Sequence, residues 1–352
     1  MASLPTLDEI RQLTQNSSSE ASGCFGDVFR YGNYAIKRVH LGEQNSHAVS
    51  REQNVLEEIR RDPTRSPFLV DYHCCYTEPG WAYLVFTWEE ARLDVKRVER
   101  TFAGAQRVLK QLAEGIRYLH GKYLVHRDIK PDNILLTSSD LLTATVKLAD
   151  FGFCKILRPE DQQTQGIGTP YYAAPEILHR LRNYGCKVDV WSFGVVAFEL
   201  LTGVKPFPAS TMLELKNLQR ASVPRGQGFP EGYEDICQGL VDFCLVYEPQ
   251  KRPNMEDVLR HPFFDQTPHI WSAINVVKEA DSLLDKMQSF LRYLRKAEMN
   301  EHHESFQNAA NSMMISLSSA CVSAKMQLEA GHQDLEHVTA VLDRISMVQD
   351  TK

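Results

Sequence analysis

The chain has 352 residues, of which 24% are charged and 43% are hydrophobic, and its formal net charge is −6 at pH 7. This composition is typical of a soluble globular protein of one large or two ordinary domains, and its acidic balance gives no case for nucleic-acid binding. The first 20 residues lack the apolar core of a signal peptide, and no run of about 18 apolar residues predicts a membrane span.

Residues 1–12 predict a loose lead-in, with a short helix over Leu7–Leu13. The segment Ala21–Phe29 then has two glycines three positions apart, Gly23 and Gly26, followed by alternating apolar residues. This pattern indicates a β-hairpin whose tip can approach a ligand through bare backbone. Taken alone, the segment is better interpreted as an ordinary hairpin turn.

A strand and a helix are predicted next. Tyr34–Lys37 indicates a strand that ends in a lysine, which in isolation would be a solvated side chain. Ser46–Arg61 has the spacing of an amphipathic helix, with Glu52 four positions before Leu56. Its apolar face is formed by Val49, Val55, Leu56 and Ile59.

Two further strands are predicted over Phe68–Val70 and Trp81–Trp88, and a helix over Thr101–His120. The loop Leu124–Leu136 follows. It places Asp128 and Asn133 between two apolar runs, with Lys130 between them and Pro131 to stiffen the turn. Such a loop can aim a carboxylate, an amine and an amide at one point.

The rest of the first 265 residues alternates short strands and helices. Leu141–Leu148 predicts a short strand pair, and Asp189–Leu201 predicts a strongly apolar helix. A last amphipathic segment ends at Phe264.

The loop around Asp128 closely resembles the catalytic loop of protein kinases, H-R-D-L-x-x-x-N, with Ile129 in place of the usual leucine. Other kinase motifs occur in the same order along the chain. Asp150-Phe151-Gly152 resembles the D-F-G motif, and Gly168–Glu176 resembles the end of a Ser/Thr-kinase activation loop. The resemblance implies an α+β, bilobal protein kinase fold over residues 13–265, with a β-rich N-lobe (13–87) and a helical C-lobe (88–265).

The resemblance also implies a role for individual residues. Lys37, held by Glu52, would bind the α- and β-phosphates of ATP, and Asp128 would accept the proton of the substrate hydroxyl. Asn133 and Asp150 would bind Mg²⁺, for which oxygen donors are suited. Lys130 is the residue type of Ser/Thr kinases at its position, and Asp189 and the pair Arg252–Glu176 would be scaffold.

ATP would lie between the lobes. The glycine loop resembles G-x-G-x-x-G-x-V with Ala21 in place of the first glycine. Phe86 would block the pocket behind the purine, and the segment 87–90 would form the hinge. The residues that would line the nucleotide site are Ala21, Ser22, Gly23, Cys24, Phe25, Gly26, Val28, Ala35, Lys37, Thr87, Trp88, Leu135 and Asp150.

Three residues are candidates for regulation. Arg127 would pair with a phosphate on the activation loop, as in kinases that carry this arginine. We expect Thr169 to contact Asp128 and Lys130, and we take Thr164 as the candidate phosphorylation site. The alternative for Thr164 is a solvated residue of a loop that orders itself.

Residues 266–352 differ in kind, because apolar residues recur there at intervals of three and four in a coiled-coil-like stripe. They predict long helices that pack on the kinase domain or pair with a second copy in a homodimer. The stretch 286–296 is also basic and amphipathic, which is compatible with a calmodulin-type target or an autoinhibitory segment. An ordinary helix with a solvated face is the favoured interpretation.

The sequence therefore predicts a Ser/Thr protein kinase that uses ATP and Mg²⁺ on protein substrates. The alternative is a kinase-like, nucleotide-binding scaffold that acts through its tail, which the complete set of catalytic residues disfavours. The run 150–155 is similar to calmodulin-dependent and related kinases but is too short to assign a subgroup. The eight cysteines have no metal-like spacing, so we expect reduced thiols and a location in the cytosol or the nucleus.

Overall fold

The structure is a computed structural model that describes residues 3–23, 26–42, 46–98, 101–156, 169–180, 184–221 and 228–265, together with Val322. The chain divides into two compact units, Met1–Phe264 and Asp265–Lys352. The helices and stripes that the sequence predicts over residues 266–352 lie outside the described residues, apart from Val322. Among the described residues, no helix combines the length and the apolar character needed to cross a membrane.

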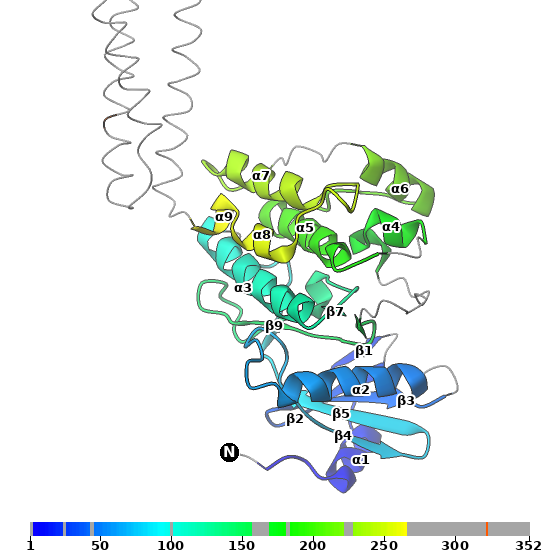
Figure 1. Cartoon of the computed structure of the whole chain (residues 1–352). Coiled ribbons are helices and arrows are strands. Elements are labelled where there is room, and N and C mark those ends of the chain that lie inside the picture. The colour runs from blue at the N-terminus through cyan, green and yellow to red at the C-terminus, as the bar shows by residue number, and fades with distance from the viewer. Residues whose placement is uncertain are drawn as a thin grey trace, which may run out of the picture. The chain divides into compact units, whose positions relative to one another are not determined.

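A five-stranded antiparallel sheet forms the N-lobe (Figure 1), with its strands in the order β1-β2-β3-β5-β4. The strands are β1 (Ala21–Gly23), β2 (Gly26–Tyr31), β3 (Tyr34–His40), β4 (Tyr72–Glu78) and β5 (Trp81–Thr87). Strand β3 lies in the middle, where Lys37 is paired with Val28 of β2 and Leu84 of β5. Because successive side chains of a strand point to opposite faces, Lys37 and its neighbours Ile36 and Arg38 face opposite sides of the sheet.

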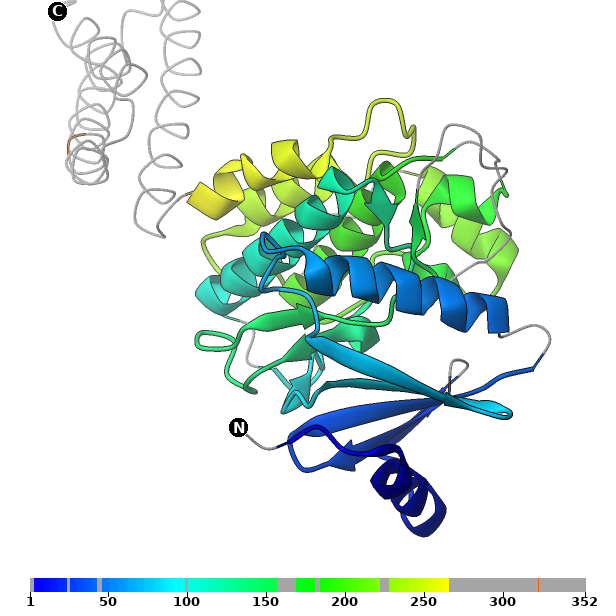
Figure 2. The ribbon, with the colours of Figure 1, turned by 60° about the horizontal axis from the view of Figure 1, so that its bottom comes forward.

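Two helices, α1 (Leu7–Asn16) and α2 (Ser46–Arg61), cover opposite faces of this sheet (Figures 1 and 2). The bounds of α2 are those that the sequence predicts. Its apolar stripe is buried as expected, and Glu52 lies on the same face and is only 4% exposed. The helix therefore carries a carboxylate into the interior of the lobe.

The first helix, α1, is longer than expected and is packed rather than loose. It begins with a capping box in which Thr6 and Glu9 satisfy each other's backbone amides. Ile10 is fully buried in a cluster with Phe29, Ile36, Tyr83 and Val85. Helix α1 is thus part of the hydrophobic core of the N-lobe.

The C-lobe is helical and is built around α5 (Lys187–Thr202), which contacts both α3 and α7 (Figure 1). Helix α5 is buried on all sides from Val188 to Thr202, and it ends at Gly203 in the left-handed conformation. Gly194 lets it approach α7 closely, because a β-carbon there would collide with Cys244 and Leu245. The other helices are α3 (Phe102–Gly121), α4 (Pro175–Leu178), α6 (Met212–Arg220), α7 (Glu234–Cys244), α8 (Met255–Leu259) and α9 (Pro262–Asp265).

Two small sheets frame the loop around Asp128. Strand β7 (Leu124–Val125) precedes the loop and pairs with β10 (Lys155–Ile156). Strand β8 (Ile134–Leu136) follows it and lies between β6 (Ala91–Arg92) and β9 (Val146–Leu148). A 3₁₀ turn over Pro131–Asn133 sits inside the loop, so both of its ends are fixed by strand pairing.

Two strand predictions are wrong. Phe68–Val70 forms only a single bridge, between Leu69 and Leu148. Leu141–Leu148 forms only one strand, β9, because Asp140 accepts hydrogen bonds from the Leu142 amide and the Thr143 hydroxyl and closes a turn there.

Candidate active site

Lys37 lies at the centre of an ion-pair cluster that joins the two lobes. Its ammonium is 2.7 Å from Glu52 Oε1 and 3.0 Å from Asp150 Oδ1. Strand β3 fixes the lysine, α2 supplies Glu52, and Asp150 comes from the turn after β9. The structure thus contains the Lys37–Glu52 pair expected from the sequence, and it adds a direct contact to Asp150.

The pKa values of the two carboxylates that share this ammonium are shifted in opposite directions. Burial and the charge of Asp150 raise the pKa of Glu52, although Lys37 opposes the shift. Burial alone would also raise the pKa of Asp150, but Lys37 holds it below its ordinary value. Burial disfavours the charged form of Lys37, yet the two carboxylates raise its pKa above the ordinary range. The lowered pKa favours the anionic form of Asp150, the form in which a carboxylate binds a metal ion.

A second cluster surrounds Asp128, which is buried. The Lys130 ammonium lies 2.7 Å from Asp128 Oδ2 and donates a hydrogen bond of the same length to the Thr169 hydroxyl. The Thr169 amide donates to Asp128 Oδ1 at 3.0 Å. The expected contacts of Thr169 with Asp128 and Lys130 are therefore present.

Asn133 is oriented by the same loop. Its Nδ2 donates to the backbone oxygen of Asp128 at 2.8 Å and to Asp128 Oδ2 at 2.9 Å. Because the amide nitrogen faces Asp128, the amide oxygen is the atom that can bind a metal ion.

Asp189 of α5, which is completely buried, anchors the loop that carries Asp128. Asp189 accepts hydrogen bonds from the backbone amides of His126 and Arg127, both at 2.9 Å, and it lies 2.9 Å from His120 Nε2. Burial would raise the pKa of Asp189, but these hydrogen bonds and the nearby histidines lower it. The scaffold role expected for Asp189 agrees with these contacts.

Backbone strain marks both clusters. Arg127 and Asp150 have φ values of 66° and 65°, in the left-handed region that side chains other than glycine rarely adopt. Strain of this kind persists only where surrounding contacts enforce it. For Arg127 these contacts are its Nε to the Phe153 carbonyl at 2.6 Å and its guanidinium to the Tyr184 hydroxyl at 3.0 Å.

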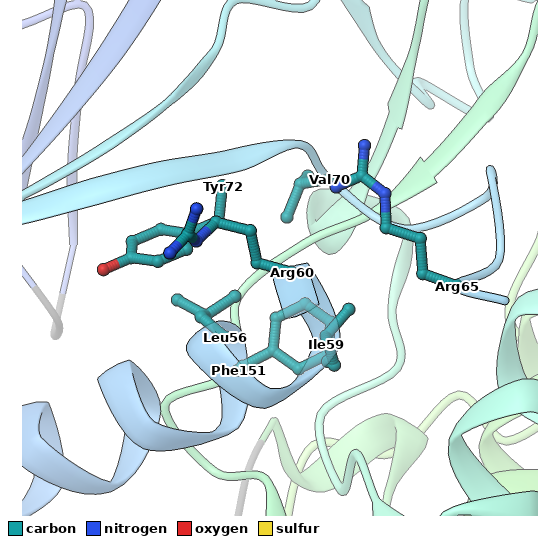
Figure 3. Close-up of a pocket in the computed structure, with 7 residues that line it drawn as sticks. All are labelled: Leu56, Ile59, Arg60, Arg65, Val70, Tyr72 and Phe151. Carbon is teal, nitrogen blue, oxygen red and sulfur yellow. The ribbon is translucent and has the colours of Figure 1, made fainter. Parts of the chain in front are cut away.

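Phe151 connects the site to α2. Its ring packs edge-on against His126, with 5.3 Å between ring centroids, and is almost completely buried. Figure 3 shows Phe151 facing Leu56 and Ile59 of α2 in a pocket that Tyr72 and Val70 also line. The position of α2, and so of Glu52, is coupled by packing to the residue after Asp150.

Some of the predicted nucleotide-lining residues lie on strands that the structure describes, and others lie outside the described residues. Ala21, Val28 and Ala35 lie on β1, β2 and β3, and Leu135 lies on β8. Ser22 and Gly23 belong to β1, whereas Cys24, Phe25 and the candidate phosphorylation site Thr164 lie outside the described residues.

The expected hinge is more constrained than the sequence suggests. The amide of Thr87 donates to the Asp71 carbonyl at 2.9 Å, and the amide of Trp88 donates to the Asn33 carbonyl at 2.8 Å. These two N–H groups are therefore used within the N-lobe, and a purine at the hinge would be bound by other backbone groups of the segment.

Comparison with known proteins agrees with this geometry. Residues 21–264 match the family model described as Protein kinase domain. Serine/threonine-protein kinase TAO3 of Gallus gallus is 31% identical over 284 residues, which cover 76% of this chain and 30% of that protein. Serine/threonine-protein kinase shk1/pak1 of Schizosaccharomyces pombe is 36% identical over 176 residues, which cover 49% of this chain and 25% of that protein.

A third relative is serine/threonine-protein kinase atg1 of Dictyostelium discoideum, 33% identical over 244 residues, which cover 66% of this chain and 35% of that protein. The chain thus spans between 25 and 35% of the length of these three relatives.

Proposed function

Because the chain belongs to the protein kinase family, with its kinase domain over residues 21–264, we propose that it transfers the γ-phosphate of ATP to serine or threonine hydroxyls of protein substrates. The observation that carries this proposal is the convergence of three side chains from both lobes: the Lys37 ammonium lies 2.7 Å from Glu52 and 3.0 Å from Asp150. The names of the three relatives support serine and threonine as acceptors.

The residues present fit Mg²⁺ together with ATP. Within the described part of the chain, no group of three or more His, Cys, Asp or Glu side chains could hold a metal ion. Mg²⁺ is commonly bound by one or two protein oxygen ligands together with substrate phosphates, and Asp150 and Asn133 offer that donor set. When bound, the metal would neutralise charge on the phosphates.

The chain's own residues would supply positioning and proton acceptance. Lys37 would bind phosphate oxygens and is kept protonated by Glu52 and Asp150. Asp128 would accept the proton of the substrate hydroxyl, while Lys130, bonded to the same carboxylate, would contribute positive charge beside the transferred group. Phosphoryl transfer depends mainly on such positioning and charge neutralisation.

Asp128→Asn tests the proton acceptor. We expect kcat to fall on the order of 100- to 10,000-fold, the usual contribution of a general base, while ATP affinity stays largely unchanged. The measurement is radiolabel transfer from ATP to a generic basic protein, with ATP binding followed by calorimetry.

Asp132→Asn is the matched control, because Asp132 lies in the same loop but has a side chain that is 66% exposed. Its kcat should remain near that of the wild type. Full activity of Asp128→Asn would exclude the proposed acceptor. A wild-type protein that binds ATP without transferring phosphate would favour the alternative function, a nucleotide-binding scaffold.

We also propose that the activation loop regulates the enzyme through Thr164. The support is Arg127, whose guanidinium binds Phe153 and Tyr184 on the two sides of the segment that contains Thr164. A phosphate near this guanidinium would form charge-assisted hydrogen bonds.

Phosphatase treatment tests this regulation. It is expected to lower the activity of the wild-type protein several-fold. The activity of Thr164→Ala should already be low and should not change on treatment. Equal activity of Thr164→Ala and wild type before treatment would show that the loop orders itself without this phosphate.

Residues 266–352 are proposed to mediate pairing with a second copy, on the strength of their apolar stripe. Deletion of these residues should convert a dimer into a monomer in light scattering coupled to gel filtration. A full-length chain that is already monomeric would remove this idea. The cytosolic or nuclear location stays a prediction, as does the ordinary helix with a solvated face that is favoured over a calmodulin target for residues 286–296.

A further inference from the structure

Arg38 links the N-terminal helix to the glycine hairpin (β1 and β2) at Asp27, next to the turn of the hairpin. It follows Lys37 on β3, so its side chain lies on the opposite face of the sheet, the face that α1 covers (Figure 2). One guanidinium nitrogen donates to the Thr14 carbonyl of α1 at 3.3 Å. The other lies 2.8 Å from Oδ2 of Asp27, the residue after Gly26 in the hairpin.

The guanidinium is held in place by stacking as well as by hydrogen bonds. It lies between the rings of Phe29 and Trp81, at 4.9 and 4.7 Å from their centroids. A planar cation enclosed by two aromatic faces keeps a fixed orientation. The backbone of the hairpin also lies close to that of Arg38, because a β-carbon at Gly26 would collide with the Arg38 carbonyl oxygen.

The contact with α1 involves an end of the helix that needs a partner. The Thr14 carbonyl belongs to the last turn of α1, where the carbonyl oxygens have no N–H donor within the helix. A guanidinium at this end is also favoured by the helix dipole. Helix α1 itself is fixed by its buried residue Ile10 and by the ion pair of Arg11 with Glu78 at 2.7 Å.

We propose that Arg38 is a positioning residue that couples α1 to the glycine hairpin and thereby sets the affinity for nucleotide phosphates. Arg38 fixes the Asp27 side chain and adds a positive charge beside this carboxylate. Without that charge, the carboxylate would repel a triphosphate bound near Gly26 more strongly, and the hairpin would lose a contact that fixes it next to its turn. This inference rests on the proposed function, because it requires that ATP binds beneath the hairpin.

The test measures ATP affinity by calorimetry and the KM values for ATP and protein substrate, all on the full chain. Arg38→Gln is expected to weaken ATP binding about tenfold, as for loss of a hydrogen bond between charged groups. The KM for protein substrate should not change. Arg38→Lys retains the charge and should recover part of the affinity.

Two further variants separate positioning from a general loss of stability. Arg11→Ala removes the ion pairs of Arg11 with Glu78 and Asp8, leaves Arg38 and the hairpin intact, and should leave the KM for ATP unchanged. Adding Asp27→Asn to Arg38→Gln removes the carboxylate, so the double variant should bind ATP better than Arg38→Gln alone.

An unchanged ATP affinity in Arg38→Gln would overturn the inference, as would an equal loss in Arg11→Ala. Tight ATP binding by the wild type together with either result would leave the proposed kinase function intact. A wild-type protein that fails to bind ATP would instead overturn the proposed function and this inference with it.

Discussion

Replacing Lys37 by alanine is expected to abolish phosphoryl transfer, with a loss of about 1,000-fold or more in kcat/KM. The ammonium pairs with Glu52 and Asp150, and no described neighbour can take its position on the central strand. Asp150→Asn should have an effect of similar size, because a neutral amide is a poorer ligand for a hard cation. Radiolabel transfer from ATP to a basic protein measures both losses.

Both variants need controls for folding. Lys110→Ala changes an exposed lysine of α3 and should retain wild-type activity. Thermal unfolding should show that Lys37→Ala and Asp150→Asn remain folded. Substantial residual turnover in both folded variants would contradict the assignment of these two residues.

Replacing Arg252 by alanine is expected to reduce the free energy of unfolding by about 3–5 kcal/mol, the range for breaking a buried ion pair from one side. The guanidinium is completely buried and lies 2.7 Å and 3.1 Å from the two oxygens of Glu176. It also donates to the carbonyls of Val246 and Lys187 and stacks over Trp191 at 5.2 Å. Its removal would leave the Glu176 carboxylate buried without its cation. Urea unfolding measures the resulting loss in the free energy of unfolding.

The matched control is Arg260→Ala, whose guanidinium pairs with Glu256 but is 70% exposed. Exposed ion pairs contribute only about 0–1 kcal/mol to the free energy of unfolding, so the urea midpoint of this variant should be close to that of the wild type. The double variant Arg252→Met with Glu176→Leu should be more stable than Arg252→Ala alone, because it leaves no buried charge. Equal stability of Arg252→Ala and Arg260→Ala would show that the buried pair contributes little.

Much of the site could be predicted because its parts are short motifs in a fixed order. The pairs Lys37–Glu52 and Arg252–Glu176, and the contacts of Thr169, were all expected from the sequence, and the structure contains them. The bounds of α2 were predicted correctly because its apolar stripe has clear helical spacing.

The missed elements lack a clear periodic signal. Strand β4, Tyr72–Glu78, is mostly half-buried, so polar and apolar residues do not alternate along it. Helix α1 was predicted as a short helix over Leu7–Leu13, and only its packing was missed, because it depends on tertiary contacts of Ile10 that no local pattern shows. The hinge amides of Thr87 and Trp88 likewise find their acceptors in distant segments.

The pairing of Arg38 with Asp27 was also missed, although a signal for it exists. Strand alternation places the residue after Lys37 on the outer face of the sheet, and the antiparallel register places it opposite Asp27. Only the packing of α1 shows that this face is covered, so the link to Thr14 could not be deduced from the strand alone.

Different faces of the buried helix α5 contact different functional and structural parts of the C-lobe. Asp189 holds the loop of Asp128, Ser192 and Glu199 bind Tyr172 beside Thr169, and Trp191 stacks against Arg252. Because α5 has no solvent-facing stripe, a polar substitution at any position from Val188 to Thr202 would bury a polar group and lower the free energy of unfolding. Substitutions should therefore be tolerated least in α5 within the C-lobe, and natural sequence variation is expected to fall outside this helix.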